Sequence, residues 1–385
     1  MRFHGYRRSN GRVGVRNHVL VFPTVICAAG VAEKISREVP GTVYLGHQHG
    51  CGHLGDERDH MIRAMVGSCS NPNVAGVLLV GLGCEMLSAE LLGQKLREAG
   101  QRVETITTQA MQGTGDAIAR GTELARKLLE GAEGLQREEV DASALMVAAK
   151  CGASDTLSGL TANPATGVAC DLLIGQGGSA IFTETPELLG AEHVLAKRAA
   201  DEGVESRIWG ITSRTENRIK AMGLDIREAE PGPGNIEAGL TTLAEKSLGA
   251  IRKGGTTPIV EVVDYAQRPS RQGLVIMDGP AHDVVSVTGM VAAGAQIVVF
   301  TTGIGTPVGS PIAPVIKISS SSALYQRWKE NIDLNAGAIL DGEETLQSMG
   351  ERLFEEIMEV ASGKPTRAEI LGHREFAIHT IAPTV

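Results

Sequence analysis

The stretch NPNVAGVLLVGLGCE, residues 71–85, joins an apolar run to a glycine-containing turn that ends in a cysteine and a glutamate. An apolar run of this length, centred on residues 74–80, is typical of a strand buried on both faces of a parallel sheet. Similar runs at 18–23, 42–46 and 102–107 alternate with amphipathic stretches at 27–38, 56–67, 87–99 and 113–130. The first 140 residues therefore predict a parallel sheet wound with helices.

The rest of the chain repeats this alternation with longer connections. Strands are expected at 144–150, 179–183, 258–264, 273–277, 296–300 and 315–319. The polar, turn-rich stretch 128–144 separates the two parts, so we expect one α/β domain at 1–140 and a second at 141–385. The expected fold is two wound α/β domains with mostly parallel sheets and an active-site cleft at the carboxyl ends of the strands. The connections 230–239 and 301–314 are rich in Gly, Pro and Thr, and their length favours a functional role.

Charge and composition exclude several classes of protein. The 385-residue chain has a formal net charge of −9, and its Lys and Arg residues are scattered, so no basic face for nucleic acid is expected. The N-terminus lacks the apolar segment of a signal peptide, and the longest apolar run, 19–31, is interrupted by Pro23. We therefore expect a soluble, cytoplasmic protein that has no membrane partner.

Four of the six cysteines stand at the ends of predicted strands, where open α/β sheets bind their ligands. They are Cys27, Cys51, Cys84 and Cys151. Cys69 and Cys170 fall within predicted helices, where a small buried hydrophobic residue is the simplest interpretation. The same interpretation, a packed thiol, is the alternative for each strand-end cysteine taken singly. Together, the four strand-end cysteines predict a metal site or a redox-sensitive active site.

The segment HQHGCGH, residues 47–53, places three histidines around Cys51, namely His47, His49 and His53, and Glu85 follows Cys84. This density of soft and borderline ligands suits iron or zinc. The spacing matches neither a zinc finger nor a ferredoxin, so the sequence indicates a metal without fixing its kind.

Further polar candidates lie in the second part and near the N-terminus. They are Glu184 and Glu187 after a strand, Thr241, Thr242, Glu245 and Lys246 in LTTLAEKSLG, Thr301, Thr302, Gly303 and Gly305 in the connection 301–314, and Arg16 and Asn17 before the first parallel strand. The alternatives are a helix cap for the first group, a capping box for the second and an irregular loop in place of an anion nest for the third. For the N-terminal pair, the alternative is a solvated turn.

Nine segments carry a resemblance to a known family. They are GYRRSNGRVGVRN, FPTVIC, HQHGCG, NPNVAGVLLVGLGCE, KCGASDTLSGLTANPATG, FTETPELLGAE, PGPGNIEAGLTTLAEKSLG, FTTGIGTPVGSPIAPVIKIS and IDLNAGAIL. In this order, from about residue 5 to the C-terminus, the sequence resembles the altronate/galactarate dehydratases, also called altronate hydrolases. The resemblance implies a lyase that dehydrates a sugar acid to a 2-keto-3-deoxy acid and depends on iron or another divalent metal.

The resemblance also implies site residues. The family's metal-site motifs fall on Cys27, Cys51, Cys84 and Cys151, and its histidine falls on His47. Where the family has CGGSD this chain reads CGASD, so that Ala153 replaces a glycine. We expect the iron to be Fe²⁺ or part of an iron–sulfur cluster.

Roles for the remaining candidates follow from the chemistry of dehydration, which needs a base beside a carboxylate and an acid for the leaving hydroxyl group. His47 or Lys246 is the expected base, and Glu184 the partner acid. The expected substrate contacts are Arg16, Asn17, Thr241, Thr242, Thr301 and Gly303.

Partners and rival functions follow from the start of the matched region. The resembling dehydratases commonly carry a small β-rich domain ahead of the first motif, so we expect a separately encoded small subunit and an oligomer that binds a small hydroxy-acid. That arrangement also resembles sulfolactate sulfo-lyase, which eliminates sulfite. A non-catalytic scaffold subunit is a third possibility. A nicotinamide-dependent dehydrogenase is disfavoured because no GxGxxG follows the first strand.

Overall fold

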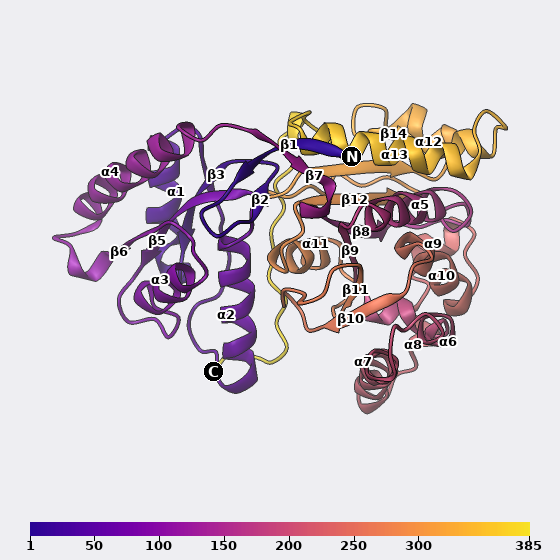
Figure 1. Cartoon of the computed structure of the whole chain (residues 1–385). Helices are drawn as coiled ribbons and strands as arrows, with labels where there is room; N and C mark the ends of the chain where they lie inside the picture. Colours follow the sequence, from indigo (N-terminus) through magenta and orange to yellow (C-terminus); the bar gives the residue numbers. More distant parts are fainter.

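The computed structural model describes residues 1–385 and contains three sheets (Figure 1). Two are parallel, with four and seven strands, and the third is a three-stranded antiparallel sheet. The predicted α/β class is confirmed. None of the helices has both the length and the apolar composition needed to cross a membrane.

The four-stranded sheet has the order β4 (Thr42–Tyr44), β3 (His18–Pro23), β5 (Val74–Gly81) and β6 (Val103–Thr107). Alternate residues of β3 enter different cores. Val19 and Val21 pack with α1 (Ala29–Glu38) and α4 (Thr114–Glu133), and Leu20 and Phe22 pack with α2 (Gly55–Cys69) and α3 (Ala89–Glu98). The sheet is apolar on both faces because helices cover both.

The seven-stranded sheet is parallel throughout. Its order is β10 (Ile259–Val263), β11 (Leu274–Met277), β9 (Ser179–Phe182), β8 (Met146–Gly152), β12 (Ile297–Thr302), β13 (Val315–Ser319) and β14 (Leu334–Asn335). Helices α5 (Ala162–Gly175) and α13 (Leu346–Ala361) cover one face, and α11 (Asp283–Ala292) covers the other. Because α11 also packs on α2, the largest hydrophobic core draws residues from both parts of the chain.

Further helices surround the edge of this sheet that carries β10. They are α6 (Glu192–Ala196), α7 (Glu202–Ala221), α8 (Ile226–Ala229), α9 (Pro233–Glu237) and α10 (Leu243–Ala250); α12 (Ser322–Arg327) and α14 (Arg367–Ile370) lie beside β13. Among them α7 packs on β10, and α10 contacts the turn at Thr185–Leu188. This turn carries Glu187 and follows Glu184.

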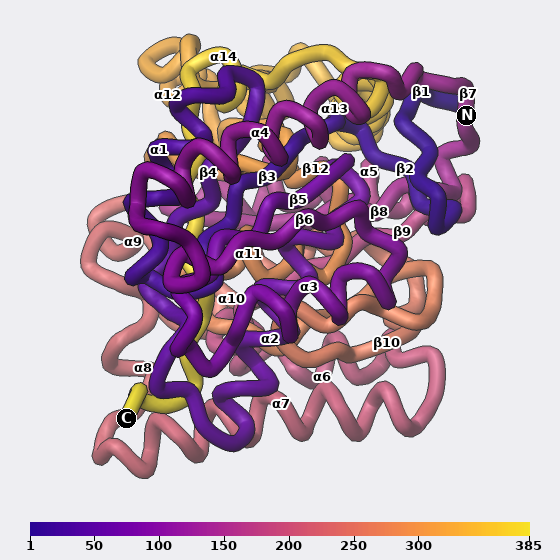
Figure 2. Tube along the Cα trace, turned by 90° about the vertical axis from the view of Figure 1, so that its left-hand side faces the viewer, coloured from indigo at the N-terminus to yellow at the C-terminus, as the bar shows by residue number.

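The antiparallel sheet and the C-terminal tail connect the two parts. Strands β2 (Val13–Gly14), β1 (Arg2–Arg7) and β7 (Glu138–Asp141) form the sheet. The stretch expected to be a turn-rich boundary is therefore largely ordered, because α4 continues to Glu133 and Val140 of β7 is buried opposite Phe3. The C-terminal tail returns beside α2, where the amide of Ile381 donates to Glu57 at 2.7 Å (Figures 1 and 2). Division into two domains stays a prediction.

All the predicted parallel strands are present, with ends within two residues of the predicted ones. The sequence did not predict the strands of the antiparallel sheet, β1, β2 and β7, or the two-residue edge strand β14. In each parallel sheet the chain changes direction once. This switch point lies between β3 and β5 in the smaller sheet, and between β8 and β12 in the larger one. Ligands of open α/β sheets bind at the carboxyl ends of strands at such a switch point.

Candidate active site

Three exposed cysteines lie on loops that follow the strands of the smaller sheet. Cys27 follows β3, Cys51 follows β4 and Cys84 follows β5. We call these loops, residues 24–28, 45–54 and 82–88, the thiol loops. They contact one another, since the amide of Ile26 donates to the carbonyl of His49 at 2.9 Å. The first two loops are thus joined through their backbones, but the sulfur atoms of Cys27, Cys51 and Cys84 do not form a group within 4.8 Å of one another, so their convergence on one metal stays a prediction.

A glycine allows the middle thiol loop to approach the first one closely. Gly50 has φ of +116°, and a Cβ placed on it would lie 2.2 Å from the carbonyl oxygen of Thr24. Its own carbonyl accepts from the amide of Leu87 at 3.2 Å. Gly50 therefore links all three loops, and any side chain at this position would push them apart.

Glu85 joins the first and third thiol loops through hydrogen bonds of its carboxylate. One oxygen accepts from the Thr24 hydroxyl at 2.7 Å and the other from the Gly83 amide at 2.6 Å. Burial alone would raise the pKa of Glu85, but these hydrogen bonds outweigh it and hold the pKa below its usual value. Both oxygens are engaged, so Glu85 fixes the loop geometry here.

The histidines of the middle loop are likewise engaged. His47 is buried, its Nε2 lies 2.6 Å from the Pro23 carbonyl, and its Nδ1 accepts from the His49 amide at 3.1 Å. Burial lowers the pKa of His47 to about 4, so the ring is neutral with Nε2 as donor. Nε2 of His53 accepts from the Gly50 amide at 3.2 Å. For His47 to bind a metal or a proton it must give up one of these contacts.

A second group of reactive residues lies at the carboxyl end of β8. The structure corrects the position of Cys151: it lies inside β8, which runs to Gly152. The preceding Lys150 is also buried, and its Nζ contacts Glu184 at 2.5 Å and Asp283 at 2.8 Å. The sequence did not identify Lys150 or Asp283, although a lysine ending an apolar strand is a signal that buried charge must be paired.

Two further lysines complete this charged cluster. Nζ of Lys253 lies 3.0 Å from Sγ of Cys151 and 3.3 Å from Glu184. Nζ of Lys246 lies 3.1 Å from Glu187 and 2.5 Å from Glu230. We define the charged cluster by its members: Lys150, Cys151, Glu184, Glu187, Glu230, Lys246, Lys253 and Asp283. Lys253, in an unremarkable IRKGG segment, carried no sequence signal of this role.

The cluster shifts the pKa values of its two central carboxyl groups in opposite directions. Burial, and then the neighbouring Glu187, raise the pKa of Glu184. For Glu187 burial acts in the same direction, but Lys246, Lys253 and Lys150 outweigh it and lower its pKa to about 2. Two carboxyl groups whose pKa values are driven apart are the arrangement of a general acid beside a general base. Burial also raises the pKa of the Cys151 thiol to about 12.

Backbone strain marks the same place. Glu184, two residues after the end of β9, has φ of +82°, and Ala153, directly after β8, has φ of +50°. Non-glycine residues adopt this left-handed region only at a cost of roughly 1–3 kcal/mol, and such residues concentrate at functional sites. This conformation favours glycine, which is the residue that the resemblance led us to expect at position 153.

Cys151, Glu184 and Glu187 are the buried group whose donor atoms could hold a metal, since those atoms lie within 4.8 Å of one another. In this arrangement, however, the ammonium of Lys253 lies against two of the three donors and already supplies the compensating positive charge. A divalent cation would have to displace it. The sulfur atoms of the thiol-loop cysteines are not gathered within that distance, but they are exposed and meet no such ammonium group, and thiolates are soft ligands suited to iron.

A cavity of about 370 Å³ adjoins the charged cluster. Its lining includes Lys246, Arg252, and Ser154 and Asp155, which follow β8 at the switch point. A larger cavity of about 650 Å³ lies between α2 and the carboxyl ends of β10 and β11, and reaches Pro186, between the two cluster glutamates. The expected cleft at strand carboxyl ends is therefore present, and the smaller cavity gives the cluster a substrate-sized opening.

The expected substrate contacts lie in several places. Arg16 pairs with Glu369 at 2.7 Å, and Asn17 joins Arg8 to the carbonyl of Ala132. Thr242 caps α10 and Thr241 donates to Glu245 at 2.5 Å, which is the capping alternative.

The connection after β12 has internal partners as well. Thr301 donates to Asn163 at 2.6 Å, and the Gly303 amide donates to the carbonyl of Ala153 at 3.0 Å. Gly303 also packs so closely on Asp155 that a Cβ would lie 2.4 Å from its carboxyl group. These contacts fix the loops around the switch point, and a direct role in substrate binding stays a prediction.

Two family models match the two parts of the chain. Residues 142–384 match the family described as D-galactarate/Altronate dehydratase, C-terminal, and residues 5–133 match D-galactarate dehydratase/Altronate hydrolase, second domain.

Individual relatives extend over nearly the whole chain. The chain is 39% identical to the (2R)-sulfolactate sulfo-lyase subunit beta of Chromohalobacter salexigens, over 98% of this chain and 96% of that one. It is 36% identical to the altronate dehydratase of Bacillus subtilis, over 98% of this chain and 77% of the relative. For the galactarate dehydratase (L-threo-forming) of Escherichia coli the identity is 37%, over 99% and 77%. The chain belongs to the galactarate/altronate dehydratase family and is a lyase.

Proposed function

We propose that the protein dehydrates a sugar acid related to altronate or galactarate to a 2-keto-3-deoxy acid. The observation that carries this proposal is the charged cluster, in which Glu187, whose pKa is lowered, and Glu184, whose pKa is raised, lie among three lysines at the carboxyl end of β8. Lys246 connects the cluster to the cavity of about 370 Å³.

In the proposed reaction Glu187 removes the proton from the carbon beside the substrate carboxylate. The ammonium groups of the lysines stabilise the negative charge that develops on the carboxylate oxygens, and Glu184 gives its proton to the departing hydroxyl group. Water leaves, and the resulting enol becomes the keto acid. Lys246 was an expected base, but Glu187 and Glu230 raise its pKa and keep it charged despite burial, so the base role passes to Glu187.

The resident metal is proposed to be iron or another divalent ion, as Fe²⁺ or in an iron–sulfur cluster. Cys27, Cys51 and Cys84 would hold it, because their thiols are exposed on mutually contacting loops. When bound, the metal would supply Lewis-acid stabilisation to substrate oxygens. Two other expected ligands, His47 and Cys151, have internal partners.

The test separates proton removal from elimination. The protein is purified without oxygen and incubated in D₂O with candidate sugar acids, and both keto acid and deuterium uptake at the carbon beside the carboxylate are measured. Glu187→Gln should abolish both. Glu184→Gln should abolish keto-acid formation but keep deuterium uptake. The exposed Glu237→Gln, a matched control, should behave like wild type. Full activity in Glu187→Gln would refute the proposal.

A second candidate is elimination of sulfite from a sulfonated hydroxy-acid. The 39% identity to the sulfo-lyase subunit, over almost the full length of both chains, favours it. The proton is removed in the same way, and the leaving group differs. Sulfite release from sulfolactate, with no keto acid from any sugar acid, would replace dehydration by this function.

The designation of that relative as subunit beta supports a second proposal, that this chain acts in an oligomer with a separately encoded small β-rich subunit. Co-expression with a candidate small subunit should give a complex that elutes as one species and turns over faster than the chain alone. Equal turnover with and without the candidate would count against it.

A further inference from the structure

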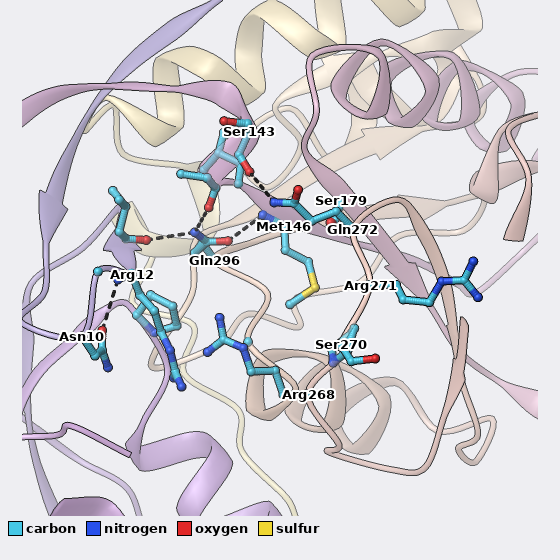
Figure 3. Close-up of a pocket in the computed structure, with 17 residues that line it drawn as sticks. Asn10, Arg12, Ser143, Met146, Ser179, Arg268, Ser270, Arg271, Gln272 and Gln296 are labelled. Atoms are coloured by element: carbon cyan, nitrogen blue, oxygen red, sulfur yellow. Dashed lines mark hydrogen bonds between the residues drawn. The ribbon is translucent and has the colours of Figure 1, made fainter. Parts of the chain in front are cut away.

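A polar pocket lies at the amino ends of the strands of the larger sheet, away from the carboxyl ends that carry the charged cluster (Figure 3). Its volume is about 450 Å³. Met146 and Ser179 begin β8 and β9, and Gln296 directly precedes β12. The loop 268–272 forms another wall. Nothing in the proposed elimination uses this end of the sheet.

The pocket has a rigid polar wall. Nε2 of Gln296 donates to the carbonyls of Val13 and Ala144 at 2.9 and 2.7 Å, and its Oε1 accepts from the Met146 amide at 2.6 Å. These bonds tie the β1–β2 hairpin to the strand ends, as the dashed lines in Figure 3 show. The pocket is therefore preformed rather than created by side chains folding over a ligand.

Arg12 and Arg268 give this pocket its charge. Figure 3 shows the guanidinium of Arg268 directed toward that of Arg12. None of the residues that line the pocket is acidic. Although the Arg268 side chain is exposed, its partial desolvation in the pocket and then Arg12 lower its pKa to about 10, and no acid acts in the opposite direction. Two like charges are thus held together without a carboxylate between them.

The chain compensates this charge only in part. Arg12 donates to the carbonyl of Ser70 at 3.1 Å, at the C-terminal end of α2, where the helix dipole carries a partial charge of about −0.5. A third arginine of the pocket, Arg271, pairs with Asp201 at 2.8 Å, and its guanidinium points away from the other two (Figure 3). Arg12 and Arg268 also line a neighbouring cavity that adds Arg63 and Lys95 and a single acid, Asp59.

We propose that this pocket binds a small molecule with two or more oxyanion groups, held between Arg12 and Arg268, at a site distinct from the one where elimination occurs. Guanidinium groups form paired N–H···O bonds with phosphate and carboxylate, so two of them favour a multiply charged ligand over a single anion. Phosphorylated metabolites and di- or tricarboxylates share this chemistry. The volume is in the range of small-molecule sites.

The test is calorimetric titration of the full chain with pyrophosphate, inorganic phosphate and malonate in separate experiments at constant ionic strength. At least one should bind saturably, pyrophosphate more tightly than phosphate if phosphorylated ligands are preferred, and malonate most tightly if dicarboxylates are. Arg268→Ala should weaken the tightest ligand at least tenfold. Arg271→Ala removes an arginine of the same loop that already has a partner. This variant should change the dissociation constant of that ligand less than twofold.

Two control measurements exclude other causes of a loss of binding. Arg268 is exposed, so its removal should leave the urea unfolding curve unchanged, and a loss of binding cannot then be a loss of fold. Glu187→Gln, altered in the charged cluster, should bind as wild type does, which separates this site from the active site. Absence of saturable binding of all three probes, or equal weakening by Arg268→Ala and Arg271→Ala, would overturn the proposal.

Discussion

The thiol loops and the charged cluster lie at equivalent points of two parallel sheets but are built in opposite ways. In the smaller sheet the switch point lies between β3 and β5, and three exposed thiols stand on loops joined by backbone hydrogen bonds. In the larger sheet it lies between β8 and β12, and the nearby Cys151 is 1% exposed among ion pairs. The same topology thus positions soft exposed donors in one place and hard buried charges in the other.

The difference teaches how each region depends on its side chains. A buried charge is stable only with its partners in place, because its lost hydration must be replaced by ion pairs and hydrogen bonds. An exposed thiol needs no partner, and it can take up a metal without breaking anything in the fold. We therefore expect substitutions in the charged cluster to affect stability, and those in the thiol loops to affect metal content.

The largest effect is expected for Lys253→Met. This change removes the buried ammonium group that lies 3.0 Å from Sγ of Cys151 and 3.3 Å from the carboxylate of Glu184. The buried carboxylate of Glu184 then loses one of its compensating positive charges. The free energy of unfolding, from urea titration, should fall by about 3–5 kcal/mol. The control is Lys220→Met, which breaks an exposed pair with Glu216 and should change it by less than about 0.5 kcal/mol. Similar losses in both variants would mean that the cluster is not the more dependent region.

An effect of intermediate size is expected on the pH dependence of the free energy of unfolding. It arises at His60, where α2 contacts the second part of the chain. His60 is buried, its Nε2 lies 3.0 Å from the carbonyl of His379 in the C-terminal tail, and its ring stacks on Tyr265. Burial, with His379 and Arg63 adding to it, lowers the pKa of His60 to about 4. Because the folded pKa is depressed, this contribution is present above the unfolded value of about 6.5 and is lost as the pH falls toward 4.

Urea unfolding at pH 7.5 and pH 5 measures this effect. Between these values wild type should lose about 2 kcal/mol through His60. His60→Gln should flatten that part of the profile, whereas His193→Gln, an exposed histidine, should reproduce the wild-type profile. A wild-type profile in His60→Gln would show that the contact between α2 and the tail does not depend on this group.

A smaller effect of opposite sign is expected at Ala153. Its φ of +50° favours glycine, so Ala153→Gly should relieve strain and raise the free energy of unfolding by about 0.5–1 kcal/mol. Ala99→Gly, at a position with φ of −76°, should lower it instead. If both variants lose stability, the left-handed backbone of Ala153 at the end of β8 does not strain the folded state.

Much of the fold follows from the sequence because parallel strands that are buried on both faces consist of long runs of apolar residues. β3 and β8 carry that signal clearly. β7 does not, since only Val140 of its four residues is buried and the rest reads as a polar turn. Short edge strands are specified by their partner, here β1, and not by their own composition.

The candidate site was predictable only in part, for a similar reason. Cysteines near the ends of strands stand out in a sequence, so Cys27, Cys51, Cys84 and Cys151 could be proposed as site residues, although Cys151 proved to lie inside β8. Pairing of buried charges depends on segments that are distant in the chain. Lys253 meets Cys151 from 102 residues away, and no local pattern announces that contact.

The smallest stability effect, and the sharpest test of the contrast, is expected for the exposed thiols. Single replacement of Cys27, Cys51 or Cys84 by Ser should change the free energy of unfolding by less than about 0.5 kcal/mol, because none of these side chains is buried. The iron content of anaerobically purified protein should nevertheless fall in each. Cys69→Ser, a buried thiol of α2, should do the reverse and lower stability by about 1–3 kcal/mol with iron unchanged. Full iron in all three exposed variants would move the metal away from the thiol loops, and the buried group of Cys151, Glu184 and Glu187 would then be the next one to examine.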